Sequence, residues 1–197
     1  LLRAVPREKH RRDVAGLPEQ PAGGDLSKVT VHDYANVMYD FLNQKTQDGT
    51  IQGTVNWTGW SMGGSIGMLL DLKGANIDEL TLLDSSPYWG DFVNPVLSIT
   101  NEDNVNDIMN SAYEDDLQTH ISTIEREDIL GHLNALLTSS PSVMVQDFKA
   151  IAPENYDIRA QLKDIKAKTL IIGGTLDSAA FPQYQSLMDE TIHESKS

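Results

Sequence analysis

The chain has 197 residues, of which 40% are hydrophobic and none is cysteine, and its formal net charge is −14. This size and composition allow one sizeable core and exclude disulfides, thiol catalysis and thiolate metal sites. The acidic charge argues against nucleic acid or an anionic membrane surface as a partner, and no apolar run is long enough to cross a membrane.

The N-terminal segment differs from the rest of the chain. Residues 1–12 carry five arginine or lysine residues and one acid. We expect a frayed terminus rather than an arm for an acidic partner, because exposed ends are the usual place for such segments. The chain begins with Leu1 rather than methionine. We therefore expect the native N-terminus to lie upstream, and we expect a cytoplasmic location.

The first regular elements are predicted to be a helix, a strand and a second helix. Thr30 followed by Asp33 makes a start like a capping box, and apolar residues recur at helical spacing as far as Asn43. A β-prone run covers residues 54–58. The helix after it is expected to end at Gly74, a residue type common at helix C-caps.

Two later apolar runs are predicted to be buried strands. They cover residues 79–84 and 169–174, and both are bounded by turn residues. The long stretch between them has helical character, and a last helix is expected over residues 182–194. This order predicts an α/β fold with a mostly parallel sheet flanked by helices and carrying a helical cap insertion.

We expect three segments in this arrangement. Residues 1–84 form the N-terminal part of the core. Residues 85–165 form the cap insertion, and residues 166–197 form the C-terminal part of the core.

The most informative motif lies between the first strand and its helix. Residues 59–63 read Gly-Trp-Ser-Met-Gly, the pattern G-x-S-x-G. A tight strand-to-helix turn strains the backbone of Ser61 and lifts its hydroxyl clear of the sheet. It leaves the Met62 amide at a helix N-terminus, where it can bind a developing oxyanion. Both glycines are expected where strand and helix approach closely. A second copy, residues 63–67, centres on Ser65, which we expect to be a packing position.

The chain resembles the α/β-hydrolase superfamily along most of its length. Two parts of the resemblance are specific: residues 59–64, which resemble the superfamily's nucleophile elbow, and residues 169–177, Thr-Leu-Ile-Ile-Gly-Gly-Thr-Leu-Asp. We call residues 59–64 the elbow. Residues 13–16 with the Gly/Pro-rich loop after them, and residues 80–87, support it. The resemblance implies a partial α/β-hydrolase fold, truncated at both ends, in which Ser61 is the nucleophile and the Met62 amide is half of an oxyanion hole.

The resemblance also implies a histidine base and an acid that orients it. The acid matches Asp177, which follows a strand end, where catalytic groups gather in α/β sheets. Asp84 also ends a strand and is the rival position. The superfamily's histidine follows one further strand, so we expect it beyond Ser197. His193 falls in the last predicted helix and is not expected to be the base. Surface or packing roles are expected for three others: His32, His120 and His132.

The substrate is expected to be a small, neutral molecule. The predicted cap is strongly acidic. We expect this charge to lie on a solvated helical face, and any part of it that faces the site would disfavour anions. Four aromatic residues lie near the serine and at the entrance to the cap: Trp60, Tyr88, Trp89 and Phe92. They could line an acyl pocket or pack the sheet against the cap, and both interpretations remain open. We expect no cofactor. We also expect no metal, because the segment with Asn101, Asp103 and Asp107 lacks the central glycine and the ligand spacing of a calcium loop.

The expected function is hydrolysis of carboxylic esters through an acyl-enzyme. The Trp-Ser-Met-Gly-Gly signature also resembles cofactor-free haloperoxidases, enol-lactonases and C–C bond hydrolases, which share the triad. A non-catalytic binding module or inert fragment is the third interpretation, because the base and the second oxyanion donor are unassigned in these residues.

Overall fold

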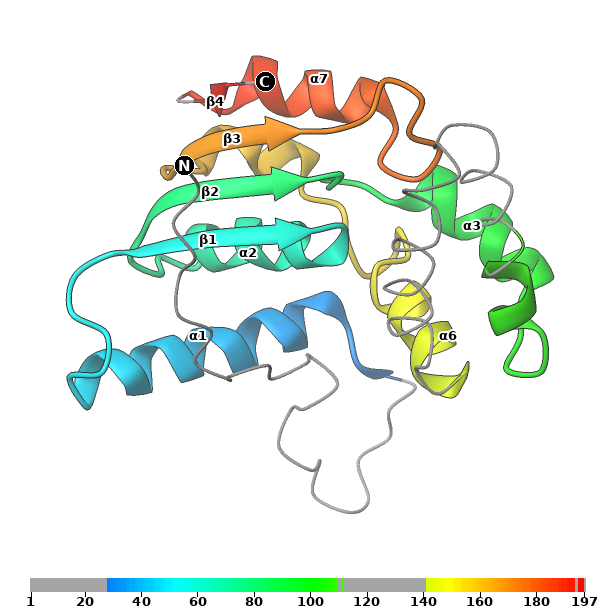
Figure 1. The fold of residues 1–197 in the computed structure, drawn as a ribbon, viewed down its shortest axis with the longest axis horizontal. Coiled ribbons are helices and arrows are strands. Elements are labelled where there is room, and N and C mark those ends of the chain that lie inside the picture. Colours follow the sequence, from blue (N-terminus) through cyan, green and yellow to red (C-terminus); the bar gives the residue numbers. More distant parts are fainter. Residues whose placement is uncertain (1–27, 110, 112–140, 194, 197) are drawn as a thin grey trace, which may run out of the picture.

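The structure is a computed structural model that describes residues 28–109, 111, 141–193 and 195–196. Within these residues, one parallel sheet has its strands in the order of the chain (Figure 1). The strands are β1 (Val55–Trp60), β2 (Ile77–Leu83), β3 (Lys168–Ile172) and β4 (Ser195–Lys196). All three strand pairs are parallel, so the carboxyl ends of the strands share one edge of the sheet.

Helices alternate with the strands, as the sequence predicts. They are α1 (Val31–Gln47), α2 (Met62–Leu72), α3 (Gly90–Ile99), α6 (Pro141–Ala150), the 3₁₀ helix η3 (Arg159–Asp164) and α7 (Pro182–Thr191). α1 begins at the predicted capping box, in which the Thr30 N–H donates to Asp33 Oδ2 at 2.8 Å. The described part of residues 85–165 is helical, with α3, α6 and η3, and its division from the core as a cap stays a prediction.

The end of the chain corrects the predicted last helix. α7 ends at Thr191, because Ile192 has an extended backbone with φ −79° and ψ 120°. The chain then pairs with β3, Ser195 opposite Thr169 and Lys196 opposite Leu170. His193 therefore lies between a helix and a short strand rather than inside a helix.

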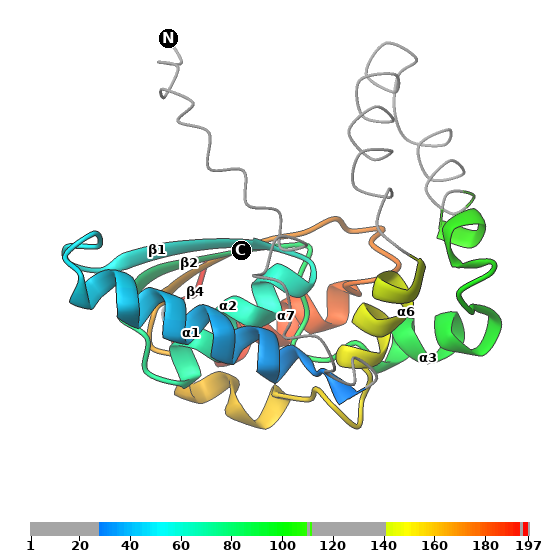
Figure 2. The ribbon, with the colours of Figure 1, turned by 90° about the horizontal axis from the view of Figure 1, so that it is seen from below.

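The sheet buries one face and exposes the other along the described residues. α1 and α2 lie on the same face (Figure 2), and Leu80, Leu82 and Ile171 are buried in the core. On the other face Leu170 and Ile172 are 42% and 49% exposed. Both predicted strands are confirmed as strands, but they are buried at alternate positions only, because consecutive side chains of a strand point to opposite faces.

A buried carboxyl group connects α2 to the start of β3. Asp71, in the last turn of α2, is 7% exposed. Its Oδ2 accepts the Lys166 N–H at 2.7 Å. Burial raises the pKa of Asp71, and the backbone amides of Lys166 and Ala167 partly offset that effect. The carboxyl group therefore fixes the end of a helix against the chain that enters the next strand.

Replacing Asp71 with asparagine is expected to flatten the pH dependence of stability. An acid whose folded-state pKa is raised binds its proton more tightly when folded. Its contribution is greatest below the unfolded-state pKa and is lost as pH rises through the folded-state pKa. Asparagine does not titrate, so urea unfolding should show Asp71→Asn gaining on the parent as pH rises through the acid range. Asp71→Ala is the control, and it should lose about 1–3 kcal/mol because buried amides lose their acceptor. Identical pH profiles for Asp71→Asn and the parent would contradict the argument.

Candidate active site

Ser61 occupies the bend between β1 and α2, as the sequence predicts. Its φ is 52° and its ψ is −124°, a strained conformation for a residue with a side chain. Three hydrogen bonds hold it. The Ser61 N–H donates to the Leu83 carbonyl at 2.9 Å, and the Ser61 carbonyl accepts the Gly64 N–H at 3.0 Å and the Ser85 hydroxyl at 2.9 Å. The end of β2 thus supports the turn at the end of β1.

Glycine is required at two positions of the elbow. The sequence-based prediction named Gly59 and Gly63, whereas the structure requires Gly59 and Gly64. A Cβ atom on Gly59 would collide with the backbone of Gly63 and Gly64. A Cβ atom on Gly64 would lie 2.6 Å from the Ser85 Cβ atom, whereas one on Gly63 would meet nothing within 4 Å. Close approach therefore explains Gly59 and Gly64, and the prediction for Gly63 was wrong. The reason is that the helix turns Gly64 toward the segment after β2.

The first amide of α2, that of Met62, is suited to bind a negatively charged oxygen. Met62 begins α2, and the first N–H groups of a helix have no acceptor within the helix. The helix dipole adds a partial positive charge at this end. The Met62 amide is thus positioned beside Ser61 where an oxygen could accept from it.

The rival serine has a structural role. Ser65 is fully buried, and its hydroxyl donates to the Ser86 carbonyl at 3.1 Å. It also accepts the Trp89 indole N–H at 2.8 Å. The expectation that Ser65 is a packing position is confirmed.

The structure brings the two rival acids together at the carboxyl edge of the sheet. Asp177 lies beyond β3, and its Oδ1 accepts the amides of Ala179 at 2.8 Å and Ala180 at 2.9 Å. Asp84 directly follows β2, and its Oδ1 accepts the Gly174 N–H at 3.2 Å. The Asp177 N–H donates to the Gly174 carbonyl at 3.2 Å, so Gly174 is hydrogen-bonded to both acids. Because the Ser61 N–H binds the residue just before Asp84, the serine and both acids lie at neighbouring strand ends.

The charge state of Asp84 reflects this setting. Burial is the main cause that raises the pKa of Asp84, and the charge and hydrogen bond of Asp177 raise it further. The hydrogen bonds from the Gly174 amide and the Trp60 side chain act in the opposite direction. Asp84 therefore holds its proton to a higher pH than an ordinary aspartate.

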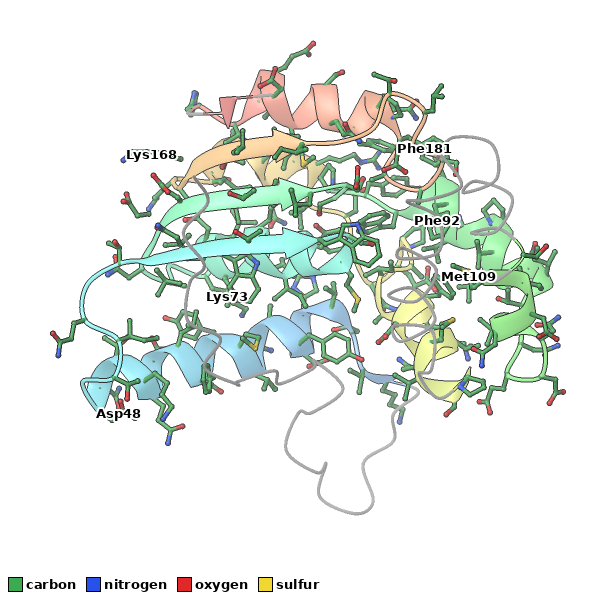
Figure 3. The ribbon with its side chains drawn as sticks, viewed as in Figure 1. Asp48, Lys73, Phe92, Met109, Lys168 and Phe181 are labelled. Atoms are coloured by element: carbon green, nitrogen blue, oxygen red, sulfur yellow. The ribbon has the colours of Figure 1, made fainter. Side chains whose placement is uncertain are left out.

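The four predicted pocket aromatics have different surroundings. Trp60 is 49% exposed beside Ser61 and contacts Asp84, whereas Trp89 is only 1% exposed. The Tyr88 ring lies 4.0 Å from the Arg159 guanidinium and edge-on to Tyr184. Phe92, at the carboxyl edge of the sheet in Figure 3, packs edge-on against Phe148 of α6 at 5.9 Å. The contacts of Tyr88, Trp89 and Phe92 are those of packing residues.

The two described histidines lie away from the elbow. His193 is exposed and lines a hollow of about 570 Å³ with Asp71, Lys163 and Lys166. These residues mark the amino ends of the strands, opposite the edge that carries Ser61. His32 is on α1, and burial lowers its pKa together with the charge of Lys73, which follows the far end of α2. His120 and His132 lie outside the described residues.

Sequence reasoning missed the support beneath the serine. The Ser85 hydroxyl holds the Ser61 carbonyl, and Asp84 has a left-handed backbone with φ 43°. Neither feature has a local signal, because the Ser85 contact depends on the pairing of β1 with β2 and the Asp84 N–H is bonded to Ile172 of β3.

Comparison with solved structures shows what the fold is. The chain superposes on a lipase-esterase related protein from Clostridium acetobutylicum with a TM-score of 0.66 at 19% identity, over 91% of this chain and 69% of that one. It superposes on an enol-lactonase from Burkholderia xenovorans with a TM-score of 0.62 at 20% identity, over 85% of this chain and 63% of that one. It also superposes on an alpha/beta hydrolase from a Medee basin deep-sea metagenome with a TM-score of 0.62 at 18% identity, over 85% of this chain and 62% of that one. The chain has the α/β-hydrolase fold.

No protein-family model and no curated protein matches the chain by sequence. At these identities, the likeness establishes the α/β-hydrolase fold and not the reaction. The chain also spans only 62% to 69% of the length of these solved hydrolases.

The described residues have neither a metal-binding cluster nor a membrane-spanning helix. They contain no group of three or more His, Cys, Asp or Glu residues placed to hold a metal ion. Among them, none of the helices has both the length and the apolar character needed to cross a bilayer.

Proposed function

We propose that the chain is the core of a serine hydrolase that cleaves neutral carboxylic esters through an acyl-enzyme. The observation that carries the proposal is the strained backbone of Ser61, with φ 52°, held at the carboxyl edge of the sheet by the ends of β1 and β2. Such strain costs about 1–3 kcal/mol and persists where the surrounding structure enforces it, which is most often at a functional site.

Each step of the proposed reaction has a named group, except the base. The Ser61 hydroxyl attacks the ester carbonyl carbon and passes its proton to a histidine. The Met62 amide donates to the oxyanion that forms. The alcohol then leaves with the proton, and water hydrolyses the acyl group from Ser61. Asp177 orients the histidine and stabilises its charged form. None of the described histidines is assigned this role.

A neutral substrate fits the charge at this edge. Asp84 and Asp177 lie at the strand ends beside Ser61, so an anionic substrate would be repelled. Trp60, which is 49% exposed beside the serine, offers an apolar surface to the substrate. Because the other three aromatics have packing contacts, the proposed pocket depends mainly on Trp60.

A lactonase is the second candidate. The solved structures similar to this chain include an enol-lactonase, and a lactone is an internal ester that opens through the same steps. No described residue favours haloperoxidase or C–C hydrolase chemistry, and a non-catalytic role is an outcome of the test below.

Ser61→Ala is expected to abolish activity while the fold is kept. In the full-length gene product, a fluorophosphonate probe should label Ser61, and the variant should carry no label. Hydrolysis of a short aryl ester should fall by at least about 10³-fold, as it does when a triad serine is removed. Ser98→Ala removes an exposed serine of α3 and is the matched control, with labelling and turnover kept.

Two results would contradict this proposal. Equal turnover by Ser61→Ala and the parent would remove Ser61 from the mechanism. Absence of both labelling and turnover in the full-length product would favour the non-catalytic interpretation. Lactones tested beside aryl esters would decide between the two enzymatic candidates.

A further inference from the structure

The carbonyl oxygen of Ser61 and the amide N–H of Met62 belong to the same peptide group. A trans peptide group is planar, and its C=O and N–H bonds point in opposite directions. The bond between Ser61 and Met62 is trans. A group that holds the Ser61 carbonyl therefore also sets the direction of the Met62 N–H, which is the proposed donor to the oxyanion.

Two donors hold this carbonyl. The Gly64 N–H donates to it at 3.0 Å, and the Ser85 hydroxyl donates to it at 2.9 Å. The first bond lies within the opening turn of α2, whereas the second comes from the segment that follows β2. Ser85 therefore restrains the peptide group relative to the sheet, and not only relative to its own helix.

Ser85 is itself held in a fixed position. It is only 2% exposed, which leaves little room for water to compete for its hydroxyl. The N–H of the preceding residue, Asp84, donates to the Ile172 carbonyl at 2.8 Å and fixes the segment against β3. On the other side, Gly64 packs so closely that a Cβ atom on it would lie 2.6 Å from the Ser85 Cβ atom. The hydroxyl thus reaches the Ser61 carbonyl from a rigid support.

We propose that Ser85 is a positioning residue for the Met62 amide, the oxyanion donor of the proposed serine hydrolase. This inference rests on the proposed function. The Ser85 hydroxyl fixes the direction of the N–H through the shared peptide group. Its hydrogen bond to the C=O also polarises that group, which strengthens the N–H as a donor. A donor that is fixed before the reaction stabilises the developing charge without having to reorganise.

The first test measures the direction of the Met62 N–H without using activity. Residual dipolar couplings of the nitrogen-15-labelled full-length product report the direction of each backbone N–H bond. Ser85→Ala should change the coupling of Met62, while the later turns of α2 keep the couplings of the parent. Ser86→Ala is the matched control, because Ser86 is also buried and its hydroxyl donates to a different carbonyl, that of Tyr88, at 2.6 Å. Equal Met62 couplings in Ser85→Ala and the parent would overturn the inference.

The second test measures the effect on the reaction, with kcat referred to the amount of Ser61 that the fluorophosphonate labels. Outright loss of an oxyanion donor lowers kcat by about 10²–10³-fold, and a misdirected donor should cost less. Ser85→Ala should therefore lower kcat for a short aryl ester by about 10-fold and change KM by less than about 2-fold, as an interaction made in the transition state does. Ser86→Ala should keep both constants. Equal losses of kcat in the two variants would mean a general loosening and would overturn the positioning role.

A second substitution covers the case in which Ser85→Ala does not fold. Ser85→Cys has nearly the same shape, and its thiol is a weak donor. Both kcat and the Met62 coupling should then lie between the values of the parent and those of a chain without the hydrogen bond. Values equal to those of the parent would overturn the inference.

The two tests separate this inference from the proposed function. If the fluorophosphonate fails to label Ser61 in the parent, the serine hydrolase proposal is defeated and the catalytic meaning of Ser85 with it. The dipolar couplings would still show whether Ser85 sets the direction of the Met62 N–H. Efficient labelling of Ser61 in the parent, with couplings and kcat unchanged in Ser85→Ala, would defeat this inference alone.

Discussion

Replacing Gly59 with alanine is expected to destabilise the folded chain by about 3 kcal/mol or more. The added methyl group would collide with backbone atoms of Gly63 and Gly64. Backbone atoms cannot rotate away as the end of a side chain can, so β1 and α2 would have to separate. Urea unfolding followed by circular dichroism would measure the loss. Labelling of Ser61 should fall as well, because the same displacement releases the strained turn.

Gly63→Ala is the matched control for this prediction. It lies in the same motif, but a Cβ atom there meets nothing within 4 Å. Its unfolding free energy should stay within about 1 kcal/mol of the parent, since alanine is the better helix former. Equal losses in Gly59→Ala and Gly63→Ala would mean that the glycines are needed for backbone conformation rather than for close approach.

These two glycines show where sequence reasoning succeeds on this fold. A strand, a bend and a helix that follow one another are local features, so the pattern places Ser61 at the turn, and the structure confirms it with a φ of 52°. The capping box of α1 is also local, since Thr30 and Asp33 are three residues apart. In both cases the interacting groups are close in sequence, and residue type largely determines their geometry.

Features that depend on the register between strands could not be predicted in this way. The choice between Gly63 and Gly64 depends on which residue of α2 faces Ser85, and that is fixed by the pairing of β1 with β2. Asp84 and Asp177 are 93 positions apart in the chain, and the pairing of β2 with β3 brings them to neighbouring strand ends. β4 has only two residues, too few to show any periodicity.

Trp89→Ala is expected to cost about 3–5 kcal/mol of unfolding free energy, as large aromatic truncations in a core do. Trp89 is 1% exposed, and its indole N–H donates to the buried Ser65 hydroxyl at 2.8 Å. Truncation would leave a cavity and remove one hydrogen bond from Ser65. Trp60→Ala is the matched comparison, because Trp60 is 49% exposed. It should lose about 1 kcal/mol or less, the range of a surface substitution.

For KM the order of the two substitutions should be the opposite of that for stability: Trp60→Ala should have the larger effect. Trp60 lies beside Ser61, so Trp60→Ala should raise KM for an aryl ester by about 10-fold, which corresponds to about 1.4 kcal/mol of lost contact with the substrate. Trp89→Ala, measured at a temperature where it remains folded, should keep the KM of the parent because its indole faces Ser65 and not the substrate. A changed KM in Trp89→Ala with unchanged stability would restore Trp89 to the pocket. An unchanged KM in Trp60→Ala would leave the proposed pocket without its main apolar contact, and the acyl group would then have to bind against residues outside the described part of the chain.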